Sequence, residues 1–411
     1  MSGSNVPPLR FTLAEASGAF GDLATLAPLL VALITVNHLN PTSVFLVVGL
    51  AYVLNGLYYR LPVSVQPLKA ASATAVALGL SASVVAAAGW LMGLVLLVLA
   101  ASQLIEPMRR LFTRPIVRGI QLGLGLLLIR SAWRLVTGPS LFPGVAGLPS
   151  LGGWPLHWFL ALGAGALLLV GLVWRRLPTS LLVLGFGLAA AAILGVPSVV
   201  GGVRWGFRPP AIVLPTLSDL ATAAVLLVVP QLPLTIGNAT IATSDVARRY
   251  FGPQAVRVQP RSLLTTMGLS NLLAGFLGGM PICHGSGGLT AHVRFGARTG
   301  GAPLLIGGLC LGTALLLDGG ILPLLTLFPL PVLGVLLLYV GVQHSLLVSD
   351  LDRLSEWAIA IGIALTSLLV GNLAVGFLVG ISAYWLPRLS VSLKRSAVHV
   401  LAGGEGPYPP G

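Results

Sequence analysis

The sequence has few charged residues. Charged side chains make up 8% of the 411 residues, whereas a soluble domain typically carries about 25%. A large soluble fold needs charged surfaces and long polar connections, and their scarcity here excludes an ordinary soluble protein. Repeated apolar runs of about 20 residues and a mean hydropathy of +0.96 instead predict an all-α polytopic membrane protein.

Cysteines and catalytic motifs are also scarce. Cys283 and Cys310 both lie in apolar stretches, without the spacing of a disulfide framework or a metal site. The sequence contains no phosphate-binding loop, metal-ligand cluster or nucleophile–base spacing. Enzyme activity, ATP-driven transport and a bound cofactor therefore have no support. We expect no cleavable signal peptide, because residues 1–10 are short and polar and the next run is a full span.

The basic residues are dispersed along the chain. The formal net charge of +13 could by itself indicate a nucleic-acid-binding protein. The arginines recur in short loops between apolar runs, as in Arg109, Arg110 and Arg114 or in Arg175 and Arg176. This is the positive-inside pattern of membrane proteins, so we expect lipid and not nucleic acid around the protein.

The apolar runs divide the chain into about fourteen segments. Seven precede the loop 195–216 and seven follow it, so the second half would enter the membrane from the opposite face. This is a 7+7 inverted repeat. The expected segments are 10–36, 42–59, 62–80, 84–101, 116–135, 157–174, 180–194, 217–243, 263–277, 279–298, 302–317, 321–342, 357–370 and 374–386.

The charges test this topology. With the N-terminus inside, 18 of the 23 lysines and arginines lie at the inner side, four lie outside and Lys69 stands apart. The outer four are Arg130, Arg134, Arg204 and Arg208. This bias predicts a multi-pass protein of the cell inner membrane with both termini in the cytoplasm.

Two segments are too polar to be ordinary spans. They are 62–75 (PVSVQPLKAASATA) and 281–299 (PICHGSGGLTAHVRFGART), one in each half. We expect each to run extended and then to become a helix, with Pro67 in the first turn of one and Gly285 opening the other. Two opposed helix N-termini at mid-membrane would form an anion site. The alternative is a pair of helix kinks without a ligand.

Ionisable residues inside the apolar segments are candidates for function. Lys69 would lie in the first turn of the first half-helix, where its charge adds to the anion site; a purely structural salt bridge is the alternative. Glu15, Gly18, Asp22 and Thr25 would share one face of the first segment. We expect Asp22 to carry a proton or to pair with Lys69, and we hold Glu15 as a second candidate for proton coupling.

Uncharged polar residues complete the expected site. Gln231, Thr235 and Asn238 would share one face of segment eight and could orient an oxyanion, or could simply hydrogen-bond between helices. Ser64 and His284 lie in the two extended stretches and are further binding candidates. We interpret Asp245, with Arg248 and Arg249, as an inner-end charge cluster.

Four stretches resemble a known family. GAFGDLATLAPLL, PVSVQPLKA, PQLPLTIGNA and PICHGSGGLTAHVRFGARTGG are similar to motifs of the molybdate transporter family, a branch of the sulfate permease superfamily. The resemblance covers nearly the whole chain and implies that Gln66, Lys69, Gly285, Ser286 and Gly287 lie next to substrate. Leu68 stands where the family usually has Met, and we expect the protein to lack the regulatory domain common in sulfate permeases.

The resemblance also implies that the chain is divided into two domains. A core domain (10–101 and 217–318) would move against a gate domain (102–194 and 319–390), with residues 195–216 as a linker and short tails at 1–9 and 391–411. We expect a proton-coupled secondary transporter for a tetrahedral oxyanion, most readily molybdate. Sulfate or tungstate transport, a nucleobase carrier, an uncoupled anion channel, an anion-binding receptor and a homodimeric assembly stay open.

Overall fold

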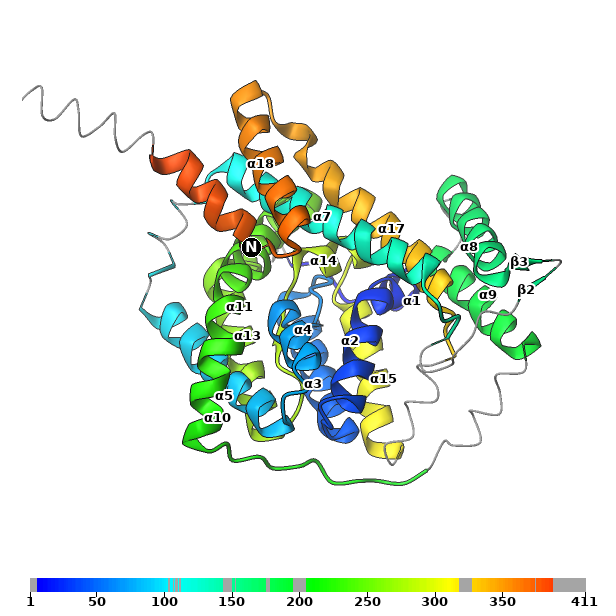
Figure 1. Ribbon diagram of the computed structural model, residues 1–411, viewed down its shortest axis with the longest axis horizontal. Coiled ribbons are helices and arrows are strands. Elements are labelled where there is room, and N and C mark those ends of the chain that lie inside the picture. The colour runs from blue at the N-terminus through cyan, green and yellow to red at the C-terminus, as the bar shows by residue number, and fades with distance from the viewer. Residues whose placement is uncertain are drawn as a thin grey trace, which may run out of the picture.

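The computed structural model describes residues 6–102, 104–105, 107, 110, 112–142, 150–151, 153–174, 178–194, 205–317, 327–373 and 375–386. Several predicted features fall outside these ranges: the N-terminal residues 1–5, Arg109, Arg175, Arg176, Arg204, the first residues of segments twelve and fourteen, and the tail 391–411. Within the described ranges the chain is mostly helical (Figure 1), and six helices are long and apolar enough to span a membrane.

The N-terminal half is mostly helical within the described residues. Its elements are α1 (Leu13–Phe20), α2 (Leu23–Thr35), α3 (Pro41–Tyr59), β1 (Gln66–Pro67), α4 (Lys69–Ala77), α5 (Ala82–Ala101), α7 (Arg114–Thr137), β2 (Ser150–Leu151), β3 (Trp154–Pro155), α8 (Leu156–Val173) and α9 (Thr179–Ile193).

The C-terminal half opens with one long helical rod. The rod comprises α10 (Leu217–Ala223), η2 (Ala224–Val228), α11 (Val229–Leu234), η3 (Thr235–Ala242) and α12 (Thr243–Phe251). After it come η4 (Gly252–Arg257), α13 (Pro260–Phe276), β4 (Ile282–Cys283), α14 (Ser286–Arg294), α15 (Gly301–Leu316), α17 (Leu330–Ser345), η5 (Leu346–Asp350), α18 (Leu354–Val370) and a helix at Val375–Leu386.

Two expected helices differ from the structure. The prediction of one unbroken first segment was wrong: the chain turns at Gly21 and Asp22, between α1 and α2, so Glu15 and Asp22 do not share one helix face. Segment eight is longer than expected, because its helix continues to Phe251, and it is π-helical at η2 and η3. Such π turns occur often at functional sites.

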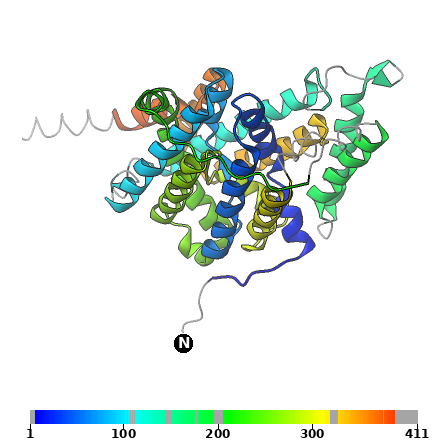
Figure 2. The same ribbon diagram turned by 90° about the horizontal axis from the view of Figure 1, so that it is seen from below.

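The helices pack in two groups. In one, α3 lies along α15 and α5 lies along α13; in the other, α7 lies along α17 and α18, and α8 packs on α9 and α17 (Figures 1 and 2). Glycines allow the close approach in the first group. A Cβ added to Gly89 of α5 would lie 2.8 Å from the backbone nitrogen of Gly275 in α13.

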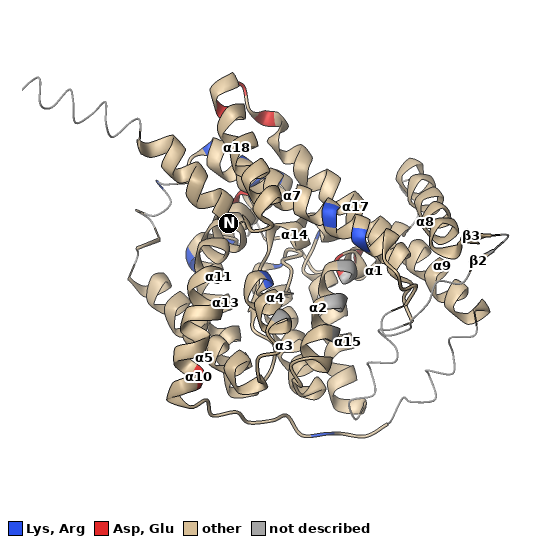
Figure 3. Ribbon diagram, viewed as in Figure 1, with Lys and Arg blue, Asp and Glu red and all other residues tan. Residues whose placement is uncertain are grey.

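The outer surface of the bundle is apolar. On α8, the side chains of Leu162 and Leu169 are 70% and 64% exposed, as expected of residues that face lipid. Charged residues are sparse along the helices (Figure 3). A few lie inside, among them Glu15 and Asp22, each at most 2% exposed. Buried carboxylates in a membrane protein are expensive and mark structural caps or functional sites.

Candidate functional site

The two polar stretches meet at the centre of the molecule. The short strands β1 and β4 pair antiparallel, with Gln66 opposite Cys283 and Pro67 opposite Ile282. The N–H of Leu68 also donates to the carbonyl of Pro281 at 3.1 Å. The half-helices α4 and α14 therefore begin close to each other. Pro67 lies in β1 and not in the first helical turn, because the helix begins only at Lys69.

The N-terminus of α14 is open. Gly285 is its N-cap and makes no side-chain cap. The N–H of Gly288 turns back to the carbonyl of Gly285 at 3.1 Å. The N–H groups of Ser286 and Gly287 have no acceptor among the described residues. Unpaired N–H groups with the positive end of the helix dipole attract anions.

The N-terminus of α4 is already occupied. The side-chain oxygen of Gln231 accepts hydrogen bonds from the N–H groups of Ala70 and Ala71, at 2.9 and 3.1 Å. Its amide nitrogen donates to Thr235 Oγ1 at 3.1 Å. The expectation that both half-helices present free amides is therefore wrong for Ala70 and Ala71 of α4, because Gln231 of α11 accepts from both.

Two polar atoms of the site have no partner. Lys69 Nζ and Gln66 Oε1 are buried and lack a hydrogen-bond partner within the described part of the chain. Both face Gly285: a Cβ added there would lie 3.4 Å from Lys69 Nζ and 2.3 Å from Gln66 Oε1. An unpaired buried ammonium is costly, and an anion at the start of α14 would compensate it. A water molecule, or a proton carried by the anion, would donate a hydrogen bond to the side-chain carbonyl of Gln66.

Asp22 lies at the back of this site, at the break between α1 and α2. Its carboxylate accepts from Gln66 Nε2 at 2.7 and 2.6 Å. It also interacts electrostatically with His292 and Lys69. Asp22 therefore holds the amide of Gln66, and through it the oxygen that faces Gly285, while sharing the field of the Lys69 ammonium.

Glu15 lies elsewhere and is fully engaged. Its carboxylate accepts from the N–H groups of Arg298, Thr299 and Ala302, at 3.0, 2.9 and 3.2 Å, and from the hydroxyl of Thr299. These donors precede and begin α15. The structure gives Glu15 the role of a helix cap between α1 and α15, and it does not bring Glu15 to Asp22.

Ser64 and His284 hold the two extended stretches together. Ser64 Oγ donates to the carbonyl of Gly285 at 3.0 Å. His284 Nδ1 lies 2.9 Å from the carbonyl of Ser64, and its Nε2 lies 2.9 Å from Thr266 Oγ1 on α13. Both side chains thus bond to the protein frame around the site.

A further polar chain runs across the start of α14. Ser286 Oγ donates to Asn238 Oδ1 and also contacts His344 Nε2 at 3.2 Å. His344 Nδ1 lies 2.9 Å from Thr290 Oγ1. All four side chains are buried. Sequence reasoning missed His344 because the expected span ended at residue 342 and left His344 beyond it, whereas α17 continues to Ser345.

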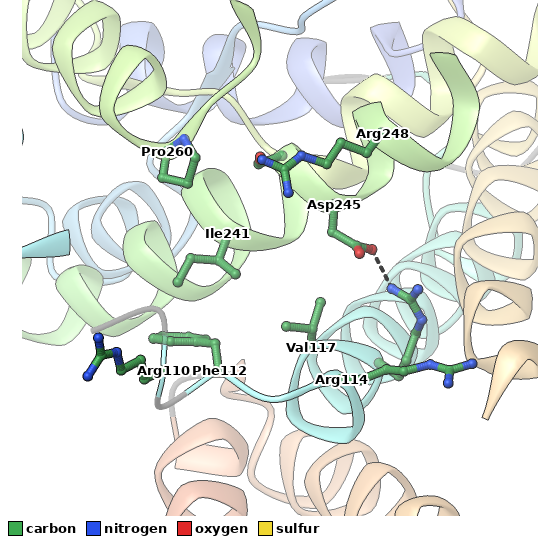
Figure 4. Close-up of a pocket in the computed structure, with 10 residues that line it drawn as sticks. Arg110, Phe112, Arg114, Val117, Ile241, Asp245, Arg248 and Pro260 are labelled. Carbon is green, nitrogen blue, oxygen red and sulfur yellow. Dashed lines mark hydrogen bonds and ion pairs between the residues drawn. The ribbon is translucent and has the colours of Figure 1, made fainter. Parts of the chain in front are cut away.

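A basic cavity of about 600 Å³ lies between α7 and α12 (Figure 4). Arg110, Arg114, Arg118 and Arg248 line it, together with Asp245. We predicted that Asp245 belongs to a local charge cluster with Arg248 and Arg249. Asp245 also forms an ion pair with Arg118 of another helix, α7.

The ion pairs beside this cavity continue to η5. Arg118 also pairs with Asp350 at 2.6 Å, and Asp350 pairs with Arg249 of α12 at 3.1 Å. Charged groups of α7, α12 and η5 are thus joined in one network beside the cavity.

Solved structures share this fold. The transmembrane domain of a cyanobacterium bicarbonate transporter, BicA, matches with a TM-score of 0.56 and 16% identity, over 88% of this chain and 96% of that one. Murine Solute Carrier 26 family member A9, an anion transporter solved in the inward-facing state, matches with a TM-score of 0.60 and 17% identity, over 93% and 69%.

Relatives by sequence are transporters and not enzymes. Molybdate transporter 1 of Chlamydomonas reinhardtii is 30% identical, over 90% of this chain and 91% of its own. Molybdate transporter 2 of Arabidopsis thaliana is 28% identical, over 91% and 87%. Residues 14–128 and 223–343 match the family described as "Molybdate transporter of MFS superfamily". On these grounds the chain belongs to the molybdate transporter family, carried on the fold of BicA and the family 26 solute carriers.

Proposed function

We propose that the protein is a secondary transporter that takes up molybdate, a tetrahedral oxyanion, across the cell inner membrane. The observation that carries the proposal is the buried ammonium of Lys69, which has no hydrogen-bond partner among the described residues and lies beside the N-terminus of α14. A dianion there would receive the N–H groups of Ser286 and Gly287 and the charge of Lys69. The names of the sequence relatives favour molybdate over sulfate or tungstate.

We further propose a seven-plus-seven inverted repeat with the core and gate domains described above. The packing supports it. When each helix is replaced by the helix at the same position in the other half, observed helix pairs become other observed pairs. The pair α3–α15 becomes α13–α5, the pair α7–α18 becomes α17–α8, and α7–α17 maps onto itself. Such a relation is expected when the second half repeats the first in opposite orientation.

Alternating access of the core against the gate would then carry the anion. The basic cavity between α7 and α12 would be its inner exit, since arginine side chains attract an oxyanion. Uptake of a dianion against a negative-inside potential costs about 2.3 kcal/mol per charge at 100 mV, or about 4.6 kcal/mol in total. Proton co-transport would offset that cost, with Asp22 as the carrier.

The experiment is mass-detected molybdate uptake into proteoliposomes, with tungstate, sulfate and uracil as competitors. We expect saturable uptake that tungstate blocks and uracil does not. Lys69→Ala should abolish it, whereas Lys394→Ala, the change at the only other lysine, should not. Stronger inhibition by sulfate would change the substrate and keep the site.

Three outcomes would contradict the proposal. Non-saturable conductance would indicate a channel, and inhibition by uracil would indicate a nucleobase carrier. Binding without accumulation would indicate a receptor.

A further inference from the structure

His344 connects the proposed gate to the proposed anion site. It lies on α17, is fully buried, and touches two hydroxyls of the half-helix α14. These are Thr290 Oγ1, 2.9 Å from Nδ1, and Ser286 Oγ, 3.2 Å from Nε2. Ser286 is the first residue of α14, where the open N–H groups are found.

The directions of these hydrogen bonds follow from counting protons. Ser286 has one hydroxyl proton, and it is donated to Asn238 Oδ1. The contact with His344 must therefore be a bond from the Nε2–H of the ring to the serine oxygen. In the neutral ring Nδ1 is then an acceptor, and Thr290 donates to it. The chain runs from Thr290 through His344 and Ser286 to Asn238.

We propose that His344 is a positioning residue for the transported oxyanion. The Nε2–H of His344 donates a hydrogen bond to the oxygen of Ser286. This bond persists when the serine hydroxyl turns from Asn238 to an anion oxygen. A hydroxyl that accepts one hydrogen bond is also a stronger donor in the next. The inference rests on the proposed anion site, and it assigns to the gate a group that acts on that site through Ser286.

The position of His344 gives this role a consequence for transport. Its two bonds cross from α17 to α14, which belong to different moving parts in the proposed mechanism. Anion binding keeps both bonds and strengthens the one to Ser286, whose hydroxyl then donates to the anion, so the gate contact responds to whether the site is filled. Without His344 the site keeps Lys69 and the N–H groups but loses the orientation of one donor.

The test is a double-mutant cycle on molybdate binding, measured by calorimetry on the full-length protein in detergent. We expect His344→Leu to raise the Kd about tenfold, the worth of one oriented hydrogen bond to an anion. In a Ser286→Ala background the same change should raise it less than twofold. His344→Gln, whose amide can both donate and accept, should restore most of the affinity.

Two further variants separate positioning from folding. Thr290→Val removes only the donor to Nδ1 and should raise the Kd by a smaller factor than His344→Leu. His157→Gln changes a buried histidine of α8 that lies in the gate and should leave the Kd unchanged. Equal increases of Kd for His344→Leu in both backgrounds would overturn the role of His344. They would not contradict the proposed transport function. Binding with the expected coupling but without uptake would refute the proposed transport alone.

Discussion

At the scale of the residue, the proposed anion site has no room for a larger side chain at Gly288. A Cβ added to Gly288 would lie 2.5 Å from Ser64 Oγ and 2.6 Å from Asp22 Oδ2 and Gln66 Nε2. All three side chains are buried and cannot withdraw. Gly288→Ala should therefore displace the Asp22–Gln66 pair, at a cost of about 1–3 kcal/mol.

Uptake by this variant should fall at least tenfold, with a lower thermal midpoint in detergent. The matched control is Gly308→Ala in α15, where an added Cβ meets nothing within 4 Å. A glycine-to-alanine change inside a helix is ordinarily stabilising by about 1 kcal/mol, so the control should keep its uptake. Equal behaviour of the two variants would refute the crowding argument.

Substitutions of the two buried carboxylates, Asp22 and Glu15, should differ in their effect on the pH dependence of molybdate uptake. If Asp22 carries the proton, Asp22→Asn should abolish the dependence of molybdate uptake on an imposed pH gradient. Glu15→Gln should keep that dependence and lower the thermal midpoint, because Glu15 caps the start of α15. Uptake measured with and without the gradient checks both. A pH dependence that persists in Asp22→Asn would rule this carrier out.

At the scale of the element, the cap on α4 has a testable function. Gln231 satisfies two first-turn N–H groups of this half-helix. Gln231→Ala should lower the free energy of unfolding by about 1–2 kcal/mol, as the loss of a helix cap does. Gln231→Glu keeps an acceptor oxygen at a helix N-terminus, so it should lower the thermal midpoint less than Gln231→Ala does. It places a negative charge at the site, so its KM for molybdate should rise. An unchanged KM would place the anion away from α4.

Much of the element structure was predictable from the sequence. Extended stretches that end in Leu68 and Gly285 follow from proline and glycine in otherwise apolar spans, and both half-helices begin within a residue or two of the expected positions. The break at Gly21 and Asp22 was missed, because the apolar residues on both sides continue without a proline at the turn. Gln231 was proposed to bind the anion, but a sequence cannot show that its side-chain oxygen already accepts hydrogen bonds from the backbone of α4.

At the scale of the whole molecule, polar contacts between the proposed core and gate are concentrated at a few places. They include the hydrogen bonds between His344 of α17 and the half-helix α14 and the contact between Ser17 and Ser180. A third is the ion-pair network that joins Arg118 and Asp350 to Asp245 and Arg249. Apolar packing accounts for much of the remaining interface, as where Leu124 and Leu128 of α7 approach Gly287. An interface with few directional bonds can slide between two arrangements, which is what transport by a moving core requires.

The contact between Ser17 of α1 and Ser180 of α9 allows that motion to be tested directly. Their hydroxyl oxygens are 3.0 Å apart, so cysteines at both positions are within reach of a disulfide. If α1 belongs to the core and α9 to the gate, oxidation of Ser17→Cys/Ser180→Cys should reduce molybdate uptake to below about a tenth, because a moving part would be tied to a fixed one. Reduction with dithiothreitol should restore it.

A second cysteine pair supplies the control within the gate. A Cβ added to Gly187 of α9 would lie 3.6 Å from Val332 Cβ of α17, close to the Cβ separation of about 3.8 Å in disulfides. Oxidised Gly187→Cys/Val332→Cys should therefore keep its uptake, since both helices would move together. Gel mobility after maleimide labelling would confirm that each bond forms. If the Ser17–Ser180 pair is cross-linked and transport continues, α1 and α9 move as one body and the boundary between core and gate must lie elsewhere.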